Sequence, residues 1–116
     1  MQYFGRATIV INGRALDSMP GAKIELGGVI RKSKTTDSRV GYVEEMAPGR
    51  VECEIAVSKN TQIEELRSLV DATVIFSADT GQQWLVREAF TEDGLKAEGK
   101  DGKMSLKLTG QPAEPA

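Results

Sequence analysis

The side chains that could do acid–base chemistry or hold a hard cation are acidic residues that occur in pairs. The pairs are Glu44 with Glu45, Glu52 with Glu54, Glu64 with Glu65, and Glu92 with Asp93. Acid–base catalysis by two carboxyls needs separated pKa values, which requires that one carboxyl be desolvated in a cleft. No pattern in the sequence supplies such a cleft, so the pairs are predicted to lie on solvated faces. A glycosidase-like carboxylate pair or a metal site is the less favoured alternative.

Apart from these acidic pairs, the chain has few residues of the types that usually take part in catalysis. The 116 residues include no histidine and one cysteine, Cys53. These counts exclude a zinc site of the Cys/His type, a Ser-His-Asp triad, a Cys-His pair and an intramolecular disulfide within this chain. Cys53 lies on the apolar face of an alternating stretch, which predicts a buried thiol that packs as a small hydrophobe. The sequence therefore predicts no enzyme activity, no catalytic residue, no metal and no cofactor.

Period-two alternation of apolar and polar residues dominates the chain and predicts β-strands. In residues 50–58, for example, Val51, Cys53 and Ile55 face one way, whereas Glu52 and Glu54 face the other. The turn residues between such stretches indicate hairpins, and Asn12-Gly13 is typical of a type I′ turn. The predicted strands cover residues 6–12, 14–16, 22–30, 40–46, 50–58, 72–78, 83–91, 95–98 and 103–109.

One segment has helical spacing. Thr61-Gln62-Ile63-Glu64 forms a capping box, and an apolar stripe continues from Ile63 to Val70. This pattern predicts a helix of about ten residues that ends near Asp71. The fold class that follows is mainly β, an antiparallel β-sandwich or barrel with one short flanking α-helix. Residues 1–110 are predicted to form a single domain, and residues 111–116, which include two prolines, a flexible tail.

A polar loop at about residues 31–41 separates two of these strands. Its basic residues are Arg31, Lys32, Lys34 and Arg39, and its acidic residue is Asp37. The loop thus has a charge of +3, and because the whole chain has a formal charge of −2, the remainder has −5. An acidic remainder argues against a general nucleic-acid binder. Ordering such a loop costs roughly 1–2 kcal/mol per residue, so contact with another molecule is the favoured use, and a flexible loop is the alternative.

Aromatic residues offer a second class of function. Trp84, Val86 and Phe90 alternate along one predicted strand and are expected to be core residues. Trp84 or Tyr42 could instead serve as a stacking platform in a β-sandwich that binds a small ligand or a carbohydrate. The glycines at positions 27, 28, 99 and 102 lack the strand-to-helix context of a phosphate loop, so turns explain them better. No stretch approaches the roughly 20 apolar residues of a membrane span.

Several short motifs follow one another in a recognisable order. They are Arg6-Ala7-Thr8-Ile9, Asn12-Gly13-Arg14, Leu16-Asp17-Ser18-Met19-Pro20-Gly21-Ala22-Lys23, Gly41-Tyr42, Val51-Glu52-Cys53, Glu65-Leu66-Arg67, Asp71-Ala72-Thr73-Val74, Asp79-Thr80-Gly81-Gln82 and Gly110-Gln111-Pro112-Ala113-Glu114. In this order and spacing they resemble the tail tube proteins of Mu-like contractile-tailed phages and prophages. Each motif alone is ordinary turn chemistry, but together they cover nearly the whole chain.

This resemblance implies a tail-tube fold and a structural subunit of stacked, hexameric rings, which form the conduit for DNA ejection. The tube ring of a type VI secretion-like or other phage-derived injection system is the alternative. The implied partners are further copies of the chain, the tail sheath, and baseplate and terminator proteins, with no membrane anchoring. The implied location is the virion tail, after assembly in the host bacterial cytoplasm.

Two sets of residues are the candidate sites. By position, the resemblance implies that the loop reaches neighbouring subunits or rings through Arg31, Lys32, Lys34, Asp37 and Arg39. Glu52 and Glu54 are candidates for an acidic lumen wall, because DNA would pass such a wall without binding it at many phosphates. The sequence leaves open which face of the sheet lines the lumen. Open strand edges that pair with a neighbour's sheet would close such a ring.

Overall fold

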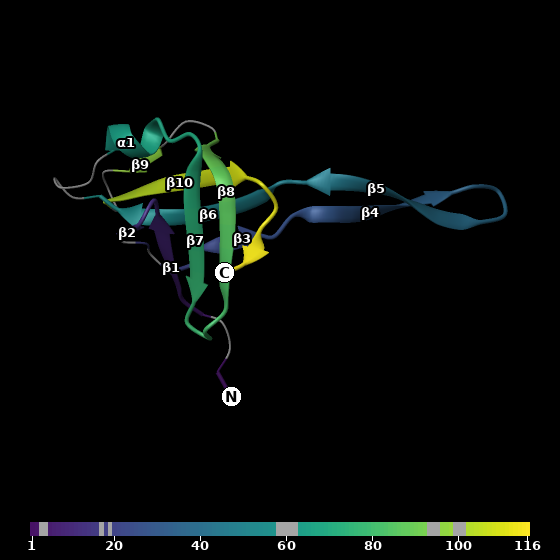
Figure 1. Cartoon of the computed structure of the whole chain (residues 1–116), viewed down its shortest axis with the longest axis horizontal. Helices are drawn as coiled ribbons and strands as arrows, with labels where there is room; N and C mark the ends of the chain where they lie inside the picture. Colours follow the sequence, from purple (N-terminus) through teal and green to yellow (C-terminus); the bar gives the residue numbers. More distant parts are fainter. Residues whose placement is uncertain (3–4, 17, 19, 58–62, 93–95, 99–101) are drawn as a thin grey trace.

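The computed structural model describes residues 1–2, 5–16, 18, 20–57, 63–92, 96–98 and 102–116, with the side chains of 96–98 not described. The described chain is built from strands and one short helix (Figure 1). The elements are β1 Ala7–Ile11, β2 Arg14–Leu16, β3 Lys23–Glu25, β4 Gly28–Thr35, β5 Val40–Ala47, β6 Gly49–Ala56, α1 Ile63–Arg67, β7 Ala72–Ala78, β8 Gln83–Thr91, β9 Lys96–Glu98, β10 Lys103–Gly110 and β11 Glu114–Pro115. No helix in these ranges has the length and apolar character needed to span a membrane.

The main sheet has the strand order β2-β1-β7-β8-β10-β6-β3, with β11 added beside β8 and β9 beside β10. All of its strand pairs are antiparallel. The long strand β8 pairs with β7 over most of its length and with β10 at Phe90 and Thr91, so the sheet folds over into two layers at this strand. The predicted mainly β fold with one short helix is confirmed.

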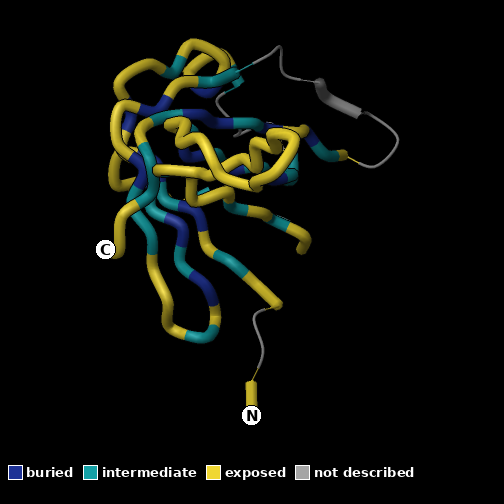
Figure 2. Tube along the Cα trace, turned by 90° about the vertical axis from the view of Figure 1, so that its right-hand side faces the viewer, coloured by how far each residue is buried: buried dark blue, intermediate teal, exposed yellow. Residues whose placement is uncertain are grey.

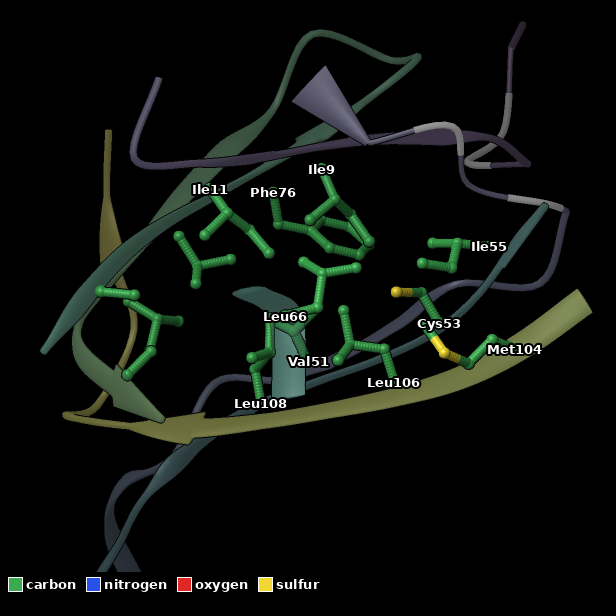
Figure 3. Packing of buried hydrophobic residues seen from close by; sticks show 14 residues of the cluster. Ile9, Ile11, Val51, Cys53, Ile55, Leu66, Phe76, Met104, Leu106 and Leu108 are labelled. Atoms are coloured by element: carbon green, nitrogen blue, oxygen red, sulfur yellow. The ribbon is translucent and has the colours of Figure 1, made fainter. Parts of the chain in front are cut away.

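The hydrophobic core lies between the two layers (Figure 3). Strand β6 alternates strictly between buried and half-buried residues, which confirms the predicted inward face of Val51, Cys53 and Ile55. Strands β1, β7, β8 and β10 and helix α1 contribute the other side chains. The largest fully buried ones are Phe76, Ile9, Met104, Leu106, Leu108, Val51, Val74 and Val86. Removing this apolar surface from water is the main favourable term in folding.

The Asn12-Gly13 turn is confirmed in detail. Both residues have positive φ, 50° and 83°, and the turn joins the paired residues Ile11 and Arg14. The Asn12 side chain also accepts a hydrogen bond from the Thr73 amide at 2.9 Å. A two-residue turn with two positive φ angles matches the right-handed twist of the strands that it joins. The turn therefore fixes the register of β1 and β2 and ties them to β7.

A β-bulge in β8 overturns one core prediction. Glu88 has a φ of 52°, and the β7–β8 register shifts by one residue between Ala72 and Val74. The extra residue reverses the alternation, so Val86 and Ala89 point into the core while Phe90 is 43 % exposed. A bulge of this kind re-aims every side chain beyond it. The prediction that Phe90 belongs to the core was wrong for this reason.

The helix α1 is shorter than predicted. It spans five residues, Ile63–Arg67, and Leu66 is its buried contact with the core. Beyond it, the Ser68 hydroxyl donates to the Glu64 carbonyl at 2.8 Å, and Asp71 has a φ of 51°. A side chain that bonds to a helix carbonyl competes with the backbone hydrogen bonds of the helix. A residue in the left-handed conformation commonly follows the last turn of a helix. Both features explain why the helix ends early. Thr61 and Gln62 of the predicted capping box lie outside the described residues.

Residues 111–116, which follow β10, were predicted to be a flexible tail but lie along the body, and we call them the C-terminal strap. Glu114 and Pro115 of β11 pair with Leu85 and Trp84 of β8. The Ala113 amide donates to the Leu26 carbonyl at 2.7 Å. Proline is compatible with a strand at the edge of a sheet, because its missing N–H then faces away from the ladder. Backbone pairing, which composition does not reveal, therefore orders the strap.

Candidate functional site

The predicted polar loop at about 31–41 is part of a two-stranded sheet, and we call residues 28–47 the projecting hairpin. β4 and β5 pair from Gly28↔Ala47 to Thr35↔Val40, and the Thr36 amide donates to the Arg39 carbonyl at 2.8 Å across the turn. The hairpin extends away from the two-layered body (Figure 1), and the molecule measures 61 Å in its longest direction against 37 and 28 Å in the others. Most of the predicted loop is thus extended strand.

Both faces of the projecting hairpin are open to solvent. Every residue from Val29 to Met46 is exposed, and Figure 2, which views the molecule from the hairpin side, shows the same in colour. Within the described part of the chain, the hairpin pairs with no other strand. A hairpin of two strands is only marginally stable in water by itself. The hairpin therefore adds little to the hydrophobic core of the domain, and its geometry favours contact with another molecule.

Ion pairs across the hairpin cancel much of its charge. Lys32 Nζ lies 2.9 Å from Glu45 Oε2, and Arg31 Nε lies 3.8 Å from Glu44 Oε1. Counted over residues 28–47, four basic and three acidic residues leave a charge of +1. Toward the tip, Lys34 and Arg39 have no carboxylate partner among the described residues. The +3 charge counted for residues 31–39 therefore overstates the field of the folded hairpin.

The root of the hairpin is closely packed. A β-carbon on Gly27, whose φ is 70°, would lie 2.3 Å from the Pro48 carbonyl oxygen. On the other arm, a β-carbon on Gly49 would lie 2.6 Å from the Gln111 carbonyl oxygen of the C-terminal strap. The strap also bonds to Leu26, just before the hairpin begins. These contacts fix the direction in which the hairpin leaves the body.

Replacing the two neighbouring glycines at the root is expected to separate close packing from backbone strain. Gly28 has a φ of 90° and open space around it, so Gly28→Ala is expected to cost about 1–2 kcal/mol of strain. Gly27→Ala is expected to cost about 1–3 kcal/mol more, because its methyl group meets the Pro48 backbone. Urea unfolding of the two variants measures the difference. Equal free energies of unfolding would show that the root is loosely packed.

The candidate lumen residues Glu52 and Glu54 lie on the outward face of β6. Each is paired with a lysine of β10: Glu52 with Lys107 at 3.6 Å and Glu54 with Lys103 at 3.1 Å. Glu52 lies directly opposite Lys107 in the register, whereas Glu54 lies opposite Ser105 and reaches diagonally to Lys103, so both are cross-strand ion pairs. This part of the face is balanced in charge and not purely acidic.

Arg50, Glu92 and Thr109 form a cluster beside the hairpin root. The Thr109 hydroxyl donates to the Glu92 carboxylate, and Arg50 Nε lies 3.8 Å from the same oxygen atom. The hydrogen bond from Thr109, followed by the charges of Arg50 and Lys107, lowers the pKa of Glu92 below its ordinary 4.5, although burial acts in the opposite direction. Because the folded pKa is the lower one, Glu92 stabilises the fold above pH 4.5, and this contribution is lost as the pH falls through the folded pKa.

Glu92→Gln is expected to remove this pH dependence. The variant should be less stable than the wild type at pH 7, and the difference should shrink as the pH falls below 4.5. Urea unfolding midpoints between pH 7 and pH 3 measure it. Thr109→Val, which removes the hydrogen-bond donor, should reproduce the effect. A stability difference that stays constant over this pH range would refute the assignment.

The other candidate chemical groups have structural partners. Glu65 lies 2.8 Å from Arg14, and Glu64 lies 3.4 Å from Arg67. Burial, followed by the charge of Glu54, raises the pKa of Cys53 to about 12, so its thiol is protonated and unreactive at neutral pH. Over the residues whose placement is described, no group of three or more Asp, Glu or Cys side chains could hold a metal ion. Asp93 lies outside those residues.

The two candidate stacking residues differ in their surroundings. Trp84 is half-buried and packs against Phe76, with ring centroids 6.2 Å apart. Tyr42 is exposed on the hairpin, and the Arg31 guanidinium lies 5.6 Å from its ring centroid. Trp84 therefore serves the core, as expected, whereas Tyr42 belongs to the surface of the projecting hairpin. The sequence analysis singled out this segment by its polar, basic residues. It did not predict that the same segment also exposes large apolar side chains.

Comparison with known proteins decides the family. The family model described as phage tail tube protein matches residues 1–115. The chain belongs to the phage tail tube protein family. Within it, the tail tube protein of Escherichia phage Mu is 34 % identical over 104 residues, covering 90 % of this chain and 86 % of the relative. The Mu-like prophage FluMu tail tube protein of Haemophilus influenzae is 32 % identical over 108 residues, covering 92 % and 90 %.

Solved structures confirm the tail-tube fold. The tube-terminating cap of the anti-feeding prophage, solved by cryo-EM, has a TM-score of 0.70 and 10 % identity, covering 96 % of this chain and 87 % of the cap protein. Hcp1 from Flavobacterium johnsoniae has a TM-score of 0.60 and 10 % identity, covering 98 % and 95 %. At this identity the likeness concerns the fold alone. It supports the architecture inferred from the sequence, while the family rests on the matching family model and the tail tube relatives.

Proposed function

We propose that copies of this chain assemble into stacked, hexameric rings that form the tube of a contractile phage tail, through which DNA is ejected. The observation that carries the proposal is the projecting hairpin, exposed on both faces in a chain of the tail tube family. An extended arm that contributes nothing to its own core is explained if it packs on other copies. The role is structural, so no catalytic group or cofactor takes part.

The contacts between copies involve two kinds of surface. The hairpin residues Arg31, Lys32, Lys34, Asp37 and Arg39 contact the neighbouring subunit or ring. The main sheet ends in the short strands β2 and β3, whose outer edges have no strand partner within the described chain. Open edges of this kind favour pairing with another chain, and closing a ring satisfies all of them at once. Together these surfaces would build rings and join one ring to the next.

The lumen wall is proposed to include Glu52 and Glu54. Because each glutamate is paired with a lysine, this wall would be nearly neutral and would offer phosphates no net positive charge. DNA would pass without specific binding, since neutral walls release no counterions from the DNA. The remaining partners are the sheath around the tube and the baseplate and terminator proteins at its ends. Subunits would assemble in the host bacterial cytoplasm into the virion tail, without membrane anchoring.

The tube ring of a type VI secretion-like or other phage-derived injection system is the second candidate. The likeness to Hcp1 and to the anti-feeding prophage cap favours it, but only at the level of the fold. The Mu and FluMu relatives, at 34 % and 32 % identity, favour the phage tail. A small-ligand-binding β-sandwich is less favoured, since Trp84 packs against the core residue Phe76.

Electron microscopy of the purified protein tests the proposal. Rings or hollow tubes with sixfold symmetry are the expected result, and labelling of phage particles with an antibody should place the protein inside the tail. A strict monomer at high concentration, together with no label on tails, would overturn the proposal. Genes for a capsid beside the gene for this chain would favour the phage tail over an injection system.

A further inference from the structure

The register of the projecting hairpin sorts its side chains onto two unlike faces. Paired residues share a face, so Val29, Val40, Tyr42 and Met46 lie on one side, and we call it the apolar face. These four side chains are between 52 and 74 % exposed. The opposite face carries Lys32, Lys34 and Glu45 with the less exposed Ile30 and Val43, and we call it the lysine face.

The apolar face has little net charge of its own. Its charged residues are Arg31 and Glu44, which pair with each other, and the Arg31 guanidinium also lies over the Tyr42 ring. An arginine engaged in this way offers little to a phosphate or an anionic lipid, because those ligands need free positive charge. An apolar strip with internally paired charge fits a protein surface instead. Clusters of exposed apolar side chains of this kind mark protein contact sites.

Charge identifies a second copy of the chain as the occupant. The hairpin has a charge of +1 and the rest of the chain −3, so each copy carries both an acidic body and a basic hairpin. Lys34 and Arg39 near the tip have no carboxylate partner among the described residues and are positioned to meet the acidic body of another copy. Opposite charges of this kind steer and orient the encounter more than they strengthen it.

We propose that the apolar face, and not the basic residues, supplies most of the binding between copies. Val29, Val40, Tyr42 and Met46 pack on the body of a second copy, while the lysine face stays toward water. The cations near the tip set the orientation of the contact. This inference rests on the proposed function and deepens it. It assigns most of the binding free energy to four apolar residues of the hairpin instead of its five charged residues at positions 31, 32, 34, 37 and 39.

Three matched variants test the assignment. The first replaces Val40, Tyr42 and Met46 on the apolar face with threonine, which keeps the strand preference of the hairpin. The second replaces Ile30 and Val43 on the lysine face with threonine. The third replaces Lys34 and Arg39 with glutamine. Each purified variant is compared with the wild type for the protein concentration at which rings or tubes form, by analytical ultracentrifugation and electron microscopy at low and high NaCl.

The apolar-face variant is expected to raise the assembly concentration at least tenfold. The lysine-face variant should change it less than threefold. The glutamine variant should slow assembly at low salt and leave the final tube fraction within threefold of the wild type. Wild-type tubes should also persist at high NaCl, because burial of apolar surface is not screened by salt.

The opposite pattern would overturn the inference. Equal assembly of the wild type and the apolar-face variant would show that the apolar face is not the main contact. Failure of the glutamine variant to form tubes, together with loss of wild-type tubes at high salt, would place the binding in the charged residues. In both cases the proposed tube function stands. If the wild type itself stays monomeric in every condition, the tube function and this inference both fail. Far-UV circular dichroism of each variant confirms that a loss of assembly is not a loss of folding.

Discussion

Replacing residues 31–44 by Asn-Gly is expected to leave a folded monomer that forms no tubes. Ile30 and Glu45 are paired in the hairpin, so a two-residue turn can join them without disturbing the strands below. Asn-Gly already makes such a turn in this chain, at Asn12 and Gly13. None of the removed residues belongs to the hydrophobic core. The cost to stability should therefore stay within about 1 kcal/mol, as for surface changes elsewhere.

The deletion separates folding from assembly by two measurements. Thermal unfolding should stay cooperative, with a midpoint within about 8 °C of the wild type. Electron microscopy and ultracentrifugation should find no rings or tubes at concentrations where the wild type is fully assembled. A shorter deletion of residues 32–38 should act in the same direction. Loss of the far-UV β signal, or normal tubes without the hairpin, would contradict the role given to this arm.

Phe76→Ala is expected to destabilise the fold by about 3–5 kcal/mol. Phe76 is 0 % exposed and lies between the two layers (Figure 3). Its ring centroid is 6.2 Å from that of the half-buried Trp84. Removing its ring leaves a cavity that the paired strands β1 and β7 cannot fill without moving. A domain of this size has roughly 5–15 kcal/mol of total stability, so the variant loses a large fraction of it.

Phe90→Ala is the matched control for this prediction. The same chemical change at a side chain that is 43 % exposed should cost less than about 1 kcal/mol. Urea unfolding of both variants measures the contrast, which depends on the bulge at Glu88. Similar losses at the two sites would mean that Phe90 is packed inward after all. A large effect of Phe90→Ala on assembly with none on stability would instead assign Phe90 to a contact between copies.

The strands of the body were predictable because one face of each is buried. In β6 the alternation of Val51 and Cys53 with Glu52 is strong, since every inward position must be apolar. The bulge at Glu88 left no such signal, because one extra residue is invisible in a short alternating pattern. The ordered C-terminal strap was missed for a related reason. Its order comes from backbone hydrogen bonds to distant segments, which any residue other than proline can make.

The hairpin was predicted only as a segment of unusual charge. Both of its faces are solvated, so no inward face imposed a period on residues 31–39. Its partial neutralisation depends on the register that places Glu44 opposite Arg31 and Glu45 near Lys32. Register between strands is a tertiary property and cannot be counted from composition. The family, in contrast, followed from the order of motifs along the chain and was confirmed.

The C-terminal strap also has a consequence for the order of events during synthesis. Residues 111–116 follow the hairpin by more than sixty positions, yet the Gln111 backbone packs against Gly49 and the Ala113 amide donates to Leu26 at the hairpin root. While the ribosome is still making the later strands, the hairpin root lacks the contacts that the strap provides, although the close approach of Gly27 to Pro48 can already form. We therefore expect a chain truncated before residue 111 to hold the arm less firmly than the full chain. The strap thus links completion of the chain to the rigidity of the arm.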